Sequence, residues 1–393
     1  MLVKFENALQ FIRARYVTEP FLILMAILYL CFFVFFILHP SLQPGEQQLT
    51  DYISFWAGGR EMAANRPEVI FNEPAFKLLQ ETELGKPFEG ILPWVISPSF
   101  MIYAVPLAKL PYLLSLIVFN LITLGTYAAM VWVLFPNRKV LLGSLVLPAV
   151  LFCLFHGQTG LMSAALIGGM IVYLPKKPFV AGLLLGLLIY KPQIGVLFPF
   201  ALVAGGYWRT IAGAACTAIA SVVLSFLLFG WTIWDLYLFS NFKTFEHLIE
   251  TQHSFARIQT VFGLVRVLTG SSQIAMIIQG ICGILAAGIV FWTWRQKIPY
   301  ELKASVLVLG ICFSTPYLQL YDCTIMTIVF VLLVRLGERE GYQPGDKEWL
   351  FLTALITGLG IVWSVGVVCS LLLGWRVWLH IKHYRKQHKS AVS

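Results

Sequence analysis

The chain has 393 residues, of which 59% are hydrophobic and 12% are charged, and its formal net charge is +9. Soluble domains are usually about 25% charged, so this composition excludes an ordinary soluble protein. The basic residues stand in short connectors between apolar runs, which follows the positive-inside pattern of membrane proteins and argues against a nucleic-acid-binding protein.

Apolar runs near 20 residues recur along the whole chain and predict an all-α, polytopic integral membrane protein. They are too long and too continuous for the strands of a membrane barrel. We expect about 11–12 transmembrane helices in one domain, 1–393. The first run, 21–39, is followed by no small-residue cleavage pattern and is predicted to be a retained helix. The expected parts are the first helix 21–39, an outer loop 40–111 with interfacial and re-entrant helices, a transmembrane core 112–336, a C-terminal transmembrane segment 349–379 and a basic cytoplasmic tail 380–393.

The first loop is expected on the outer side, because residues 40–92 hold eight acidic and four basic residues. Apolar and aromatic residues from Tyr52 to Ala63 recur at i, i+3 and i+4, which predicts a helix that ends before Pro67. We expect this helix to lie in the membrane interface, with Tyr52 and Trp56 at headgroup depth. A second short helix is predicted at 74–84.

Asp51 opens the first of these helices. Between Glu89 and Asp235 the chain has no carboxylate at all, so Asp51 has few rivals for acid–base work. It could be a helix N-cap, a fixed catalytic base, or both. Arg60, on the same helix, is interpreted as an interfacial charge with a possible contact to sugar or acceptor.

The later spans follow from the basic connectors, which we assign to the inner side. Residues 93–111 are apolar but rich in proline, and a partial or re-entrant insertion is favoured there. A single crossing by the last run would leave the basic tail on the outer side, so two short helices broken near Gly358–Gly360 are predicted. The remaining predicted spans are 112–135, 140–155, 161–174, 179–190, 194–206, 211–229, 274–294, 305–314 and 324–334.

Polar residues gather at the predicted outer ends of these spans. They are His156, Gln158, Lys191, Gln193, Arg257, Tyr317, Tyr321 and Asp322. A lysine at membrane depth is costly, so Lys191 should snorkel to the surface, pair with a distant aspartate, or bind a phosphate. Asp322 could cap the following helix, pair with Lys191 or Arg257, or hold an acceptor hydroxyl. A base, cations and sugar-type hydrogen-bonding groups on one membrane face suit glycosyl transfer from a lipid-linked phosphate.

Metal and disulfide chemistry are not expected. The seven cysteines lie in or beside apolar segments without metal-site spacing, and no cluster of carboxylates is available for a cation. We therefore predict no cofactor, with a lipid-linked sugar as the donor substrate.

An ordered set of motifs resembles glycosyltransferase family 87, whose members are polyprenyl-phosphate-sugar-dependent membrane enzymes of the GT-C superfamily and include mycobacterial mannosyltransferases. The resemblance covers roughly residues 15–335. The motifs that carry it are Asp51–Arg60 with Asn65-Arg66-Pro67 and Ile70-Phe71, Pro98-Ser99-Phe100, the Pro106 to Pro111 run, Gly157-Gln158, Gly182 and Gly186 with Tyr190-Lys191-Pro192-Gln193, and Thr315-Pro316-Tyr317 with Tyr321-Asp322. Two places depart from the family pattern: Tyr321-Asp322 stands where some members have a histidine, and Ser97-Pro98-Ser99 stands where a double proline is expected.

The resemblance implies a GT-C fold and an inverting enzyme of the bacterial inner membrane, in which Asp51 deprotonates an acceptor hydroxyl and polyprenyl phosphate leaves. The expected sugar is mannose, and the acceptor is a lipid or glycan at the outer face. Partners are then the polyprenyl-phosphate sugar, the acceptor and membrane lipids, with no nucleic acid. Donor phosphate or sugar contacts are expected from Lys191, Gln193, Arg257, His156 and Gln158, and acceptor or sugar contacts from Tyr317, Tyr321, Asp322 and Arg60.

Two other classes are consistent with a polytopic helical protein. A transporter or lipid flippase would show paired repeats and broken helices meeting at the bilayer midplane. The chain has no second copy of the Lys191-Pro192 pattern, and its ionisable residues gather at span ends. A structural or assembly protein would not require costly polar residues on one side of the membrane.

Overall fold

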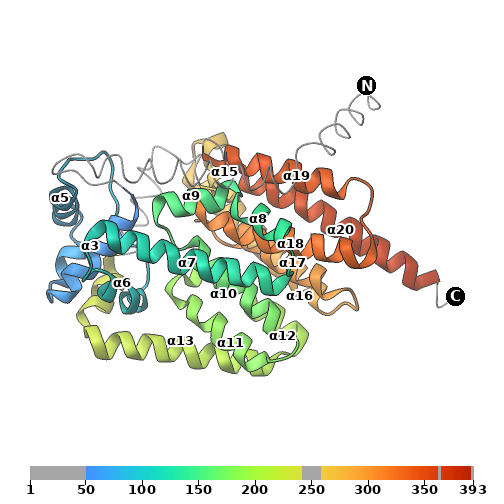
Figure 1. Cartoon of the computed structure of the whole chain (residues 1–393), viewed down its shortest axis with the longest axis horizontal. Coiled ribbons are helices and arrows are strands. Elements are labelled where there is room, and N and C mark those ends of the chain that lie inside the picture. The colour runs from blue at the N-terminus through green and yellow to red at the C-terminus, as the bar shows by residue number, and fades with distance from the viewer. Residues whose placement is uncertain (1–49, 241–257, 362–363, 391–393) are drawn as a thin grey trace.

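The computed structural model describes residues 50–240, 258–361 and 364–390, so the predicted first helix, 21–39, and Arg257 lie outside the described residues. The described residues form helices joined by short segments, with no β-strand among them, which confirms the all-α prediction (Figure 1). The elements are α3 (Tyr52–Ala63), α4 (Pro67–Phe71), α5 (Glu73–Leu84), η1 (Pro98–Phe100), α6 (Met101–Leu107), α7 (Tyr112–Leu134), α8 (Arg138–Leu145), α9 (Pro148–His156), α10 (Gly160–Tyr173), α11 (Pro178–Gly186), η2 (Leu187–Tyr190), η3 (Pro192–Gly195), α12 (Phe198–Gly205), α13 (Trp208–Phe229), α15 (Val261–Thr269), α16 (Ser272–Trp294), α17 (Tyr300–Ser314), η5 (Leu320–Ile325), α18 (Met326–Glu340), α19 (Asp346–Thr357), η6 (Gly358–Ile361) and α20 (Gly366–Ser390).

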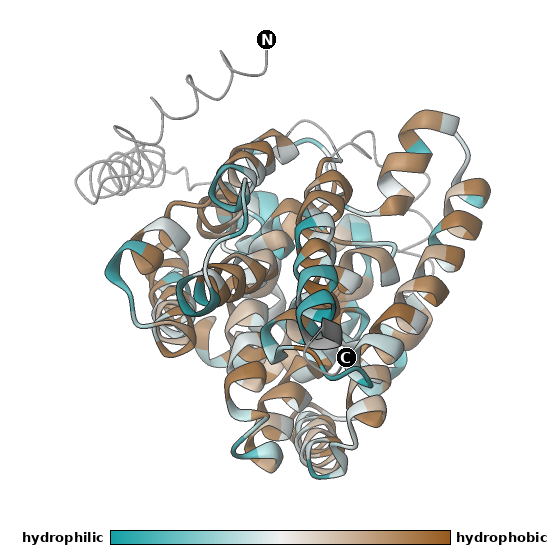
Figure 2. Cartoon of the chain, turned by 90° about the vertical axis from the view of Figure 1, so that its right-hand side faces the viewer, coloured by the Kyte–Doolittle hydropathy of each residue, from teal (hydrophilic) through white to brown (hydrophobic). Residues whose placement is uncertain are grey.

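Four helices of the described part are long and apolar enough to cross a membrane, or five if one bent pair counts as a single span. The prediction of 11–12 full spans exceeds this number, because several predicted spans are built from apolar helices of only 10–17 residues. The span formed by η5 and α18 is the most enclosed, whereas α13 and α16 expose most of their apolar side chains. Figure 2 shows hydrophobic residues on the outer sides of the helices, as expected for surfaces that face lipid.

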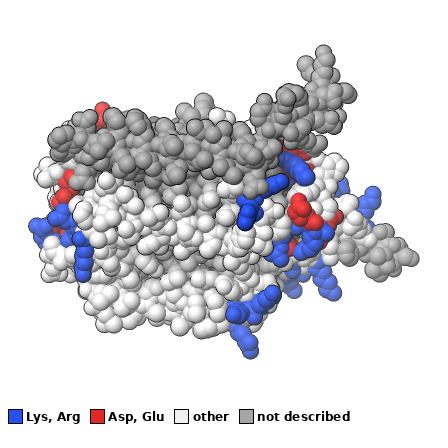
Figure 3. Space-filling model, viewed as in Figure 1, with Lys and Arg blue, Asp and Glu red and all other residues white. Residues whose placement is uncertain are grey.

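Charged side chains gather at two opposite ends of the face shown in Figure 3, with a wide uncharged band between them. One end carries α3 and α5, and the basic connectors lie at the other. This distribution matches a bilayer across the middle of the bundle, because charges within the hydrocarbon region are costly.

The outer-loop prediction needs one correction. α3 and α5 form at the predicted positions, and α3 ends before Pro67. However, Tyr52 is 1% exposed and Trp56 is 5% exposed, because α3 packs between α6 and α7. The Tyr52 hydroxyl bonds to Ser115, and the Trp56 indole nitrogen donates to the Leu110 carbonyl. These two rings therefore pack inside the protein and do not contact lipid headgroups directly, while the depth of α3 in the membrane stays a prediction.

Two predicted spans are interrupted. The run 140–155 is divided into α8 and α9, which are bent by 53°, with Pro148 at the first turn of α9. Proline removes a helical hydrogen bond and restricts the residue before it, which explains the break. The chain between α11 and α12 passes through two short 3-10 helices on either side of Lys191, and Pro192 opens the second. These breaks leave polar backbone and side chains at span ends, where a site can form.

Small residues explain the closest helix contact. A Cβ atom at Gly182 would lie 2.1 Å from the Thr210 carbonyl oxygen, and one at Gly186 would lie 2.3 Å from the Ala214 carbonyl oxygen. The pair is spaced by four residues, so both face α13, as in the small-residue motifs of membrane helices. Gly182 and Gly186 thus allow α11 to pack closely on α13.

The C-terminal run is broken at the expected place, since η6 (Gly358–Ile361) separates α19 from α20; its number of membrane crossings stays a prediction. At the start of α19, Asp346 is buried against Arg376 and His380 of α20. Burial opposes ionisation of Asp346, but hydrogen bonds from His380 and Arg376 outweigh it and hold the pKa of this carboxyl below its ordinary value. This charged cluster therefore links α19 to α20.

Candidate active site

Asp51 precedes α3, but its side chain does not cap the helix. Its backbone is already helical, with φ −60° and ψ −19°, and no backbone N–H of the first turn donates a capping hydrogen bond to the carboxylate. The Tyr52 amide nitrogen instead donates to the Thr50 hydroxyl, over 3.3 Å. The Asp51 carboxylate is partly exposed and accepts a hydrogen bond of 3.1 Å from the side-chain amide of Gln158. The N-cap interpretation is therefore wrong, and the carboxylate is directed toward a distant segment.

Gln158 reaches Asp51 because the turn between α9 and α10 touches α3. Gly157 ends α9 with φ +62°, a left-handed conformation that favours glycine. A Cβ atom at this position would lie 2.6 Å from Cβ of Tyr52, so only glycine permits the approach. The Gln158 carbonyl accepts a bond of 3.1 Å from the Cys153 thiol, which fixes the turn.

Lys191 and Asp322 form a buried ion pair. The Lys191 ammonium donates to Asp322 Oδ1 over 2.7 Å, and the two side chains are only 8% and 3% exposed. Lys191 therefore does not snorkel to the surface; of the alternatives left open, pairing with a distant aspartate is confirmed. The Asp322 Oδ2 atom accepts from the Gln319 backbone nitrogen over 3.2 Å and closes a capping box at the start of η5. Asp322 thus both caps its helix and pairs with Lys191.

Tyr321 lies near both Asp51 and Asp322. The Lys191 ammonium lies 5.2 Å from the centre of the Tyr321 ring, and Asp51 and Asp322 are both within electrostatic range of the Tyr321 hydroxyl. The start of α10 meets this segment closely, since a Cβ atom at Gly160 would lie 1.9 Å from the Tyr321 carbonyl oxygen. Asp51, Gln158, Lys191, Tyr321 and Asp322 therefore form one cluster, built from four separate stretches of the chain.

The other predicted site residues surround this cluster or lie apart from it. The His156 ring stacks on Phe152, with centroids 3.9 Å apart, and its Nδ1 atom is 2.9 Å from the Phe152 carbonyl. The Tyr317 hydroxyl accepts from the Gln319 side chain over 3.1 Å, and Gln193 is half-buried in η3.

Arg60 is separated from Asp51 by nine residues of helix, which is roughly 13 Å along its axis. It pairs with Glu83 over 2.6 Å and covers the Trp56 ring, so it does not join the cluster.

Sequence analysis did not place Tyr190 among the site residues, although Tyr190 supports the cluster together with Gln319. Gln319 supplies the cap for Asp322, and buried Tyr190 bonds to Ser163 over 2.7 Å while its carbonyl accepts from the Ser97 amide. The position of Tyr190 directly before Lys191 was the available signal. Burial, opposed by the hydrogen bond with Ser115, raises the pKa of Tyr52 well above its ordinary value, so this tyrosine stays neutral near Asp51.

Within the ranges that the structure covers, no three histidine, cysteine, aspartate or glutamate side chains lie close enough together to hold a metal ion. The chemistry available in the described cluster is that of one partly exposed carboxylate beside a buried cation. Such a carboxylate can accept a proton, and such a cation can stabilise negative charge.

The fold defines a polytopic helical membrane protein, and the cluster places a partly exposed carboxylate and a buried ion pair at the broken ends of its helices. The family model described as Glycosyltransferase family 87 matches residues 94–316, more than half of the chain, and the chain belongs to that family. It is therefore a membrane glycosyltransferase. The matched region contains Gln158 and Lys191, whereas Asp51 precedes it and Asp322 follows it. Searches of curated proteins and of solved structures gave no significant match.

Proposed function

We propose that this protein is an inverting glycosyltransferase that moves a sugar from a polyprenyl-phosphate donor to a hydroxyl group of a lipid or glycan acceptor. The main support for this proposal is the Asp51 carboxylate. It is partly exposed and is not used as a helix cap. Gln158 orients it in the same cluster as the Lys191–Asp322 pair. Family membership supports the transfer of a sugar.

In the proposed reaction Asp51 takes the proton of the acceptor hydroxyl. The hydroxyl oxygen then forms a bond to the anomeric carbon from the side opposite the phosphate. The bond between that carbon and the phosphate oxygen breaks, and its electron pair leaves with polyprenyl phosphate. General base catalysis of this kind contributes about 10²–10⁴-fold to the rate.

Asp51 is a better base than Asp322. Both oxygens of Asp322 already accept hydrogen bonds, one from Lys191 and one from the Gln319 backbone, and the side chain is 3% exposed. An acceptor hydroxyl would have to displace one of these bonds. The carboxylate of Asp51 is partly exposed, so an acceptor hydroxyl can reach it more directly.

Lys191 is proposed to stabilise the phosphate that leaves. An ammonium group has three donors, and the structure gives one of them to Asp322. In this proposal the ion pair holds the ammonium in place and lowers the free-energy cost of a charge in the membrane. The remaining N–H donors bind the phosphate. His156, Gln193 and Tyr317 are proposed to contact the sugar around it. Mannose is the expected sugar by family association.

Gln158 is proposed to position Asp51 and to stabilise its charged form. Replacement of Gln158 by methionine removes the donor at similar volume. We expect kcat/KM to fall by about 10–100-fold, as for loss of a hydrogen bond to a charged group. The acid limb of its pH profile should move to higher pH, because a carboxylate without that donor is protonated more easily.

The measurement is transfer of radiolabelled sugar between pH 5 and 9, with Gln273→Met, an exposed residue of α16, as the matched control. A lower rate with an unshifted acid limb would mean that Gln158 does not act through Asp51.

The site is proposed to face the outer side of a bacterial inner membrane. Glu68 and Glu340 are both exposed, the first at the end with α3 and the second as the last residue of α18. After exposed Cys216 is replaced by serine, a cysteine at position 68 should react with an impermeant maleimide in intact cells. A cysteine at position 340 should react only after the cells are opened. Labelling of both from outside would contradict this orientation.

A further inference from the structure

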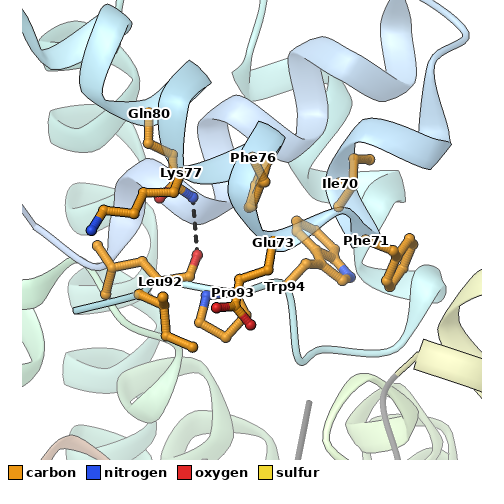
Figure 4. Close-up of a pocket in the computed structure, with 10 residues that line it drawn as sticks. Ile70, Phe71, Glu73, Phe76, Lys77, Gln80, Leu92, Pro93 and Trp94 are labelled. Atoms are coloured by element: carbon orange, nitrogen blue, oxygen red, sulfur yellow. Dashed lines mark hydrogen bonds between the residues drawn. The ribbon is translucent and has the colours of Figure 1, made fainter. Parts of the chain in front are cut away.

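A second polar pocket lies on the outer-loop unit, between α5 and the segment 91–94. It is open on one side, and aromatic and aliphatic side chains form most of its wall. Its polar side chains are Glu73, Lys77, Gln80 and Trp94 (Figure 4). None of these four belongs to the cluster around Asp51.

Two buried polar atoms in the lining of this pocket have no hydrogen-bond partner within the described residues. The Gln80 amide donates to the Leu92 carbonyl over 2.9 Å, but its oxygen, Oε1, accepts nothing. The indole nitrogen of Trp94 is also unpaired. Gln80 is 0% exposed and Trp94 is 2% exposed. Buried polar groups are nearly always bonded, so this acceptor and this donor indicate that a partner is missing at the pocket lining.

The pocket shares a wall with the helix that follows Asp51. The Ser54 hydroxyl, one turn after Asp51, donates to the Pro93 carbonyl over 3.3 Å. The Trp94 ring meets Phe55 edge-on at 6.1 Å, and a Cβ atom at Gly58 would lie 2.7 Å from the same indole. Pro93 and Trp94 thus line the pocket and also contact α3, the helix that follows the proposed base.

The lining indicates a neutral ligand rich in hydroxyl groups. Glu73 and Lys77 carry opposite charges, and Lys77 already lies 3.8 Å from Glu81 and over the Phe88 ring, which leaves no surplus cation for a phosphate. Aromatic planes with an amide oxygen and an indole N–H suit the alternating apolar and hydroxyl faces of a sugar ring. We propose that this pocket is an acceptor subsite that binds one non-reacting sugar residue of the acceptor, an inference that rests on the proposed glycosyl transfer.

Direct binding tests the subsite without donor. The full-length protein in lipid nanodiscs, free of sugar-headed detergent, is titrated with methyl α-mannoside, methyl α-glucoside and methyl α-galactoside. We expect saturable binding of at least one of them, weakened at least fivefold by Trp94→Phe and by Gln80→Met. Lys77→Met is a third variant that breaks no buried bond, and it should weaken binding as well. Leu78→Ala, on the exposed face of α5, is the matched control and should bind like the wild type.

Transfer assays separate this inference from the proposed function. The pocket variants should raise the KM for the acceptor and leave the KM for the donor unchanged. Absence of saturable binding to the wild type, or equal affinity in folded Trp94→Phe and Lys77→Met proteins, would overturn the subsite. Sugar binding by a wild-type protein that transfers nothing from polyprenyl-phosphate sugars would overturn the proposed function and leave the subsite standing.

Discussion

The Asp51→Asn enzyme is expected to fold normally and to transfer sugar at least about 10²–10⁴-fold more slowly than the wild type, because asparagine cannot take the acceptor proton. Its fold should persist, since the asparagine oxygen can still accept the hydrogen bond from Gln158 and no capping bond is lost. The measurement is transfer from a panel of radiolabelled polyprenyl-phosphate sugars to membrane lipid extract, with thermal unfolding recorded in parallel.

Glu68→Gln is the matched control for this variant, because Glu68 is an exposed carboxylate of the same outer unit. It should retain activity. Asp322→Asn tests whether Asp322 is the base instead. This variant should lose stability as well as activity, since it weakens the bond to Lys191. Sustained turnover by Asp51→Asn would remove Asp51 from the chemistry and leave Asp322 as the remaining carboxylate of the cluster.

Breaking the Lys191–Asp322 pair is expected to have the largest effect on stability. Lys191→Met leaves the Asp322 carboxylate buried without its cation, and loss of one partner of a buried pair costs about 3–5 kcal/mol. The double variant Lys191→Met with Asp322→Asn removes both charges and should recover much of that loss. Thermal unfolding in one detergent measures both effects, and Arg60→Met, which breaks an exposed pair with Glu83, should change stability by less than about 1 kcal/mol.

The double variant also tests the role of Lys191 toward the donor. If Lys191 stabilises the departing phosphate, the folded double variant should bind polyprenyl-phosphate sugar more weakly than the wild type. Its affinity for the acceptor should be unchanged. A double variant that is stable and binds the donor normally would limit the ion pair to a structural role.

Much of the architecture was predictable because hydrophobic length and charge are local properties of a sequence. The helices α3 and α5, the stop before Pro67 and the break at Gly358 follow from spacing, proline and glycine. The exposure of α3 was not predictable in this way. An apolar, aromatic helix face is equally suited to lipid headgroups and to a protein interior, and only the positions of α6 and α7 decide between them.

The sequence by itself determined that this chain is a helical membrane protein, that its polar residues stand at the ends of apolar runs, and that few carboxylates are available among them. Only the tertiary structure decided which of these residues meet. Gln158 contacts Asp51 across 107 positions, and Lys191 contacts Asp322 across 131. Such pairings depend on how closely helices approach, as at Gly157 and Gly160, and on which buried charge another must neutralise. These are properties of packing, and no local pattern in the chain encodes them.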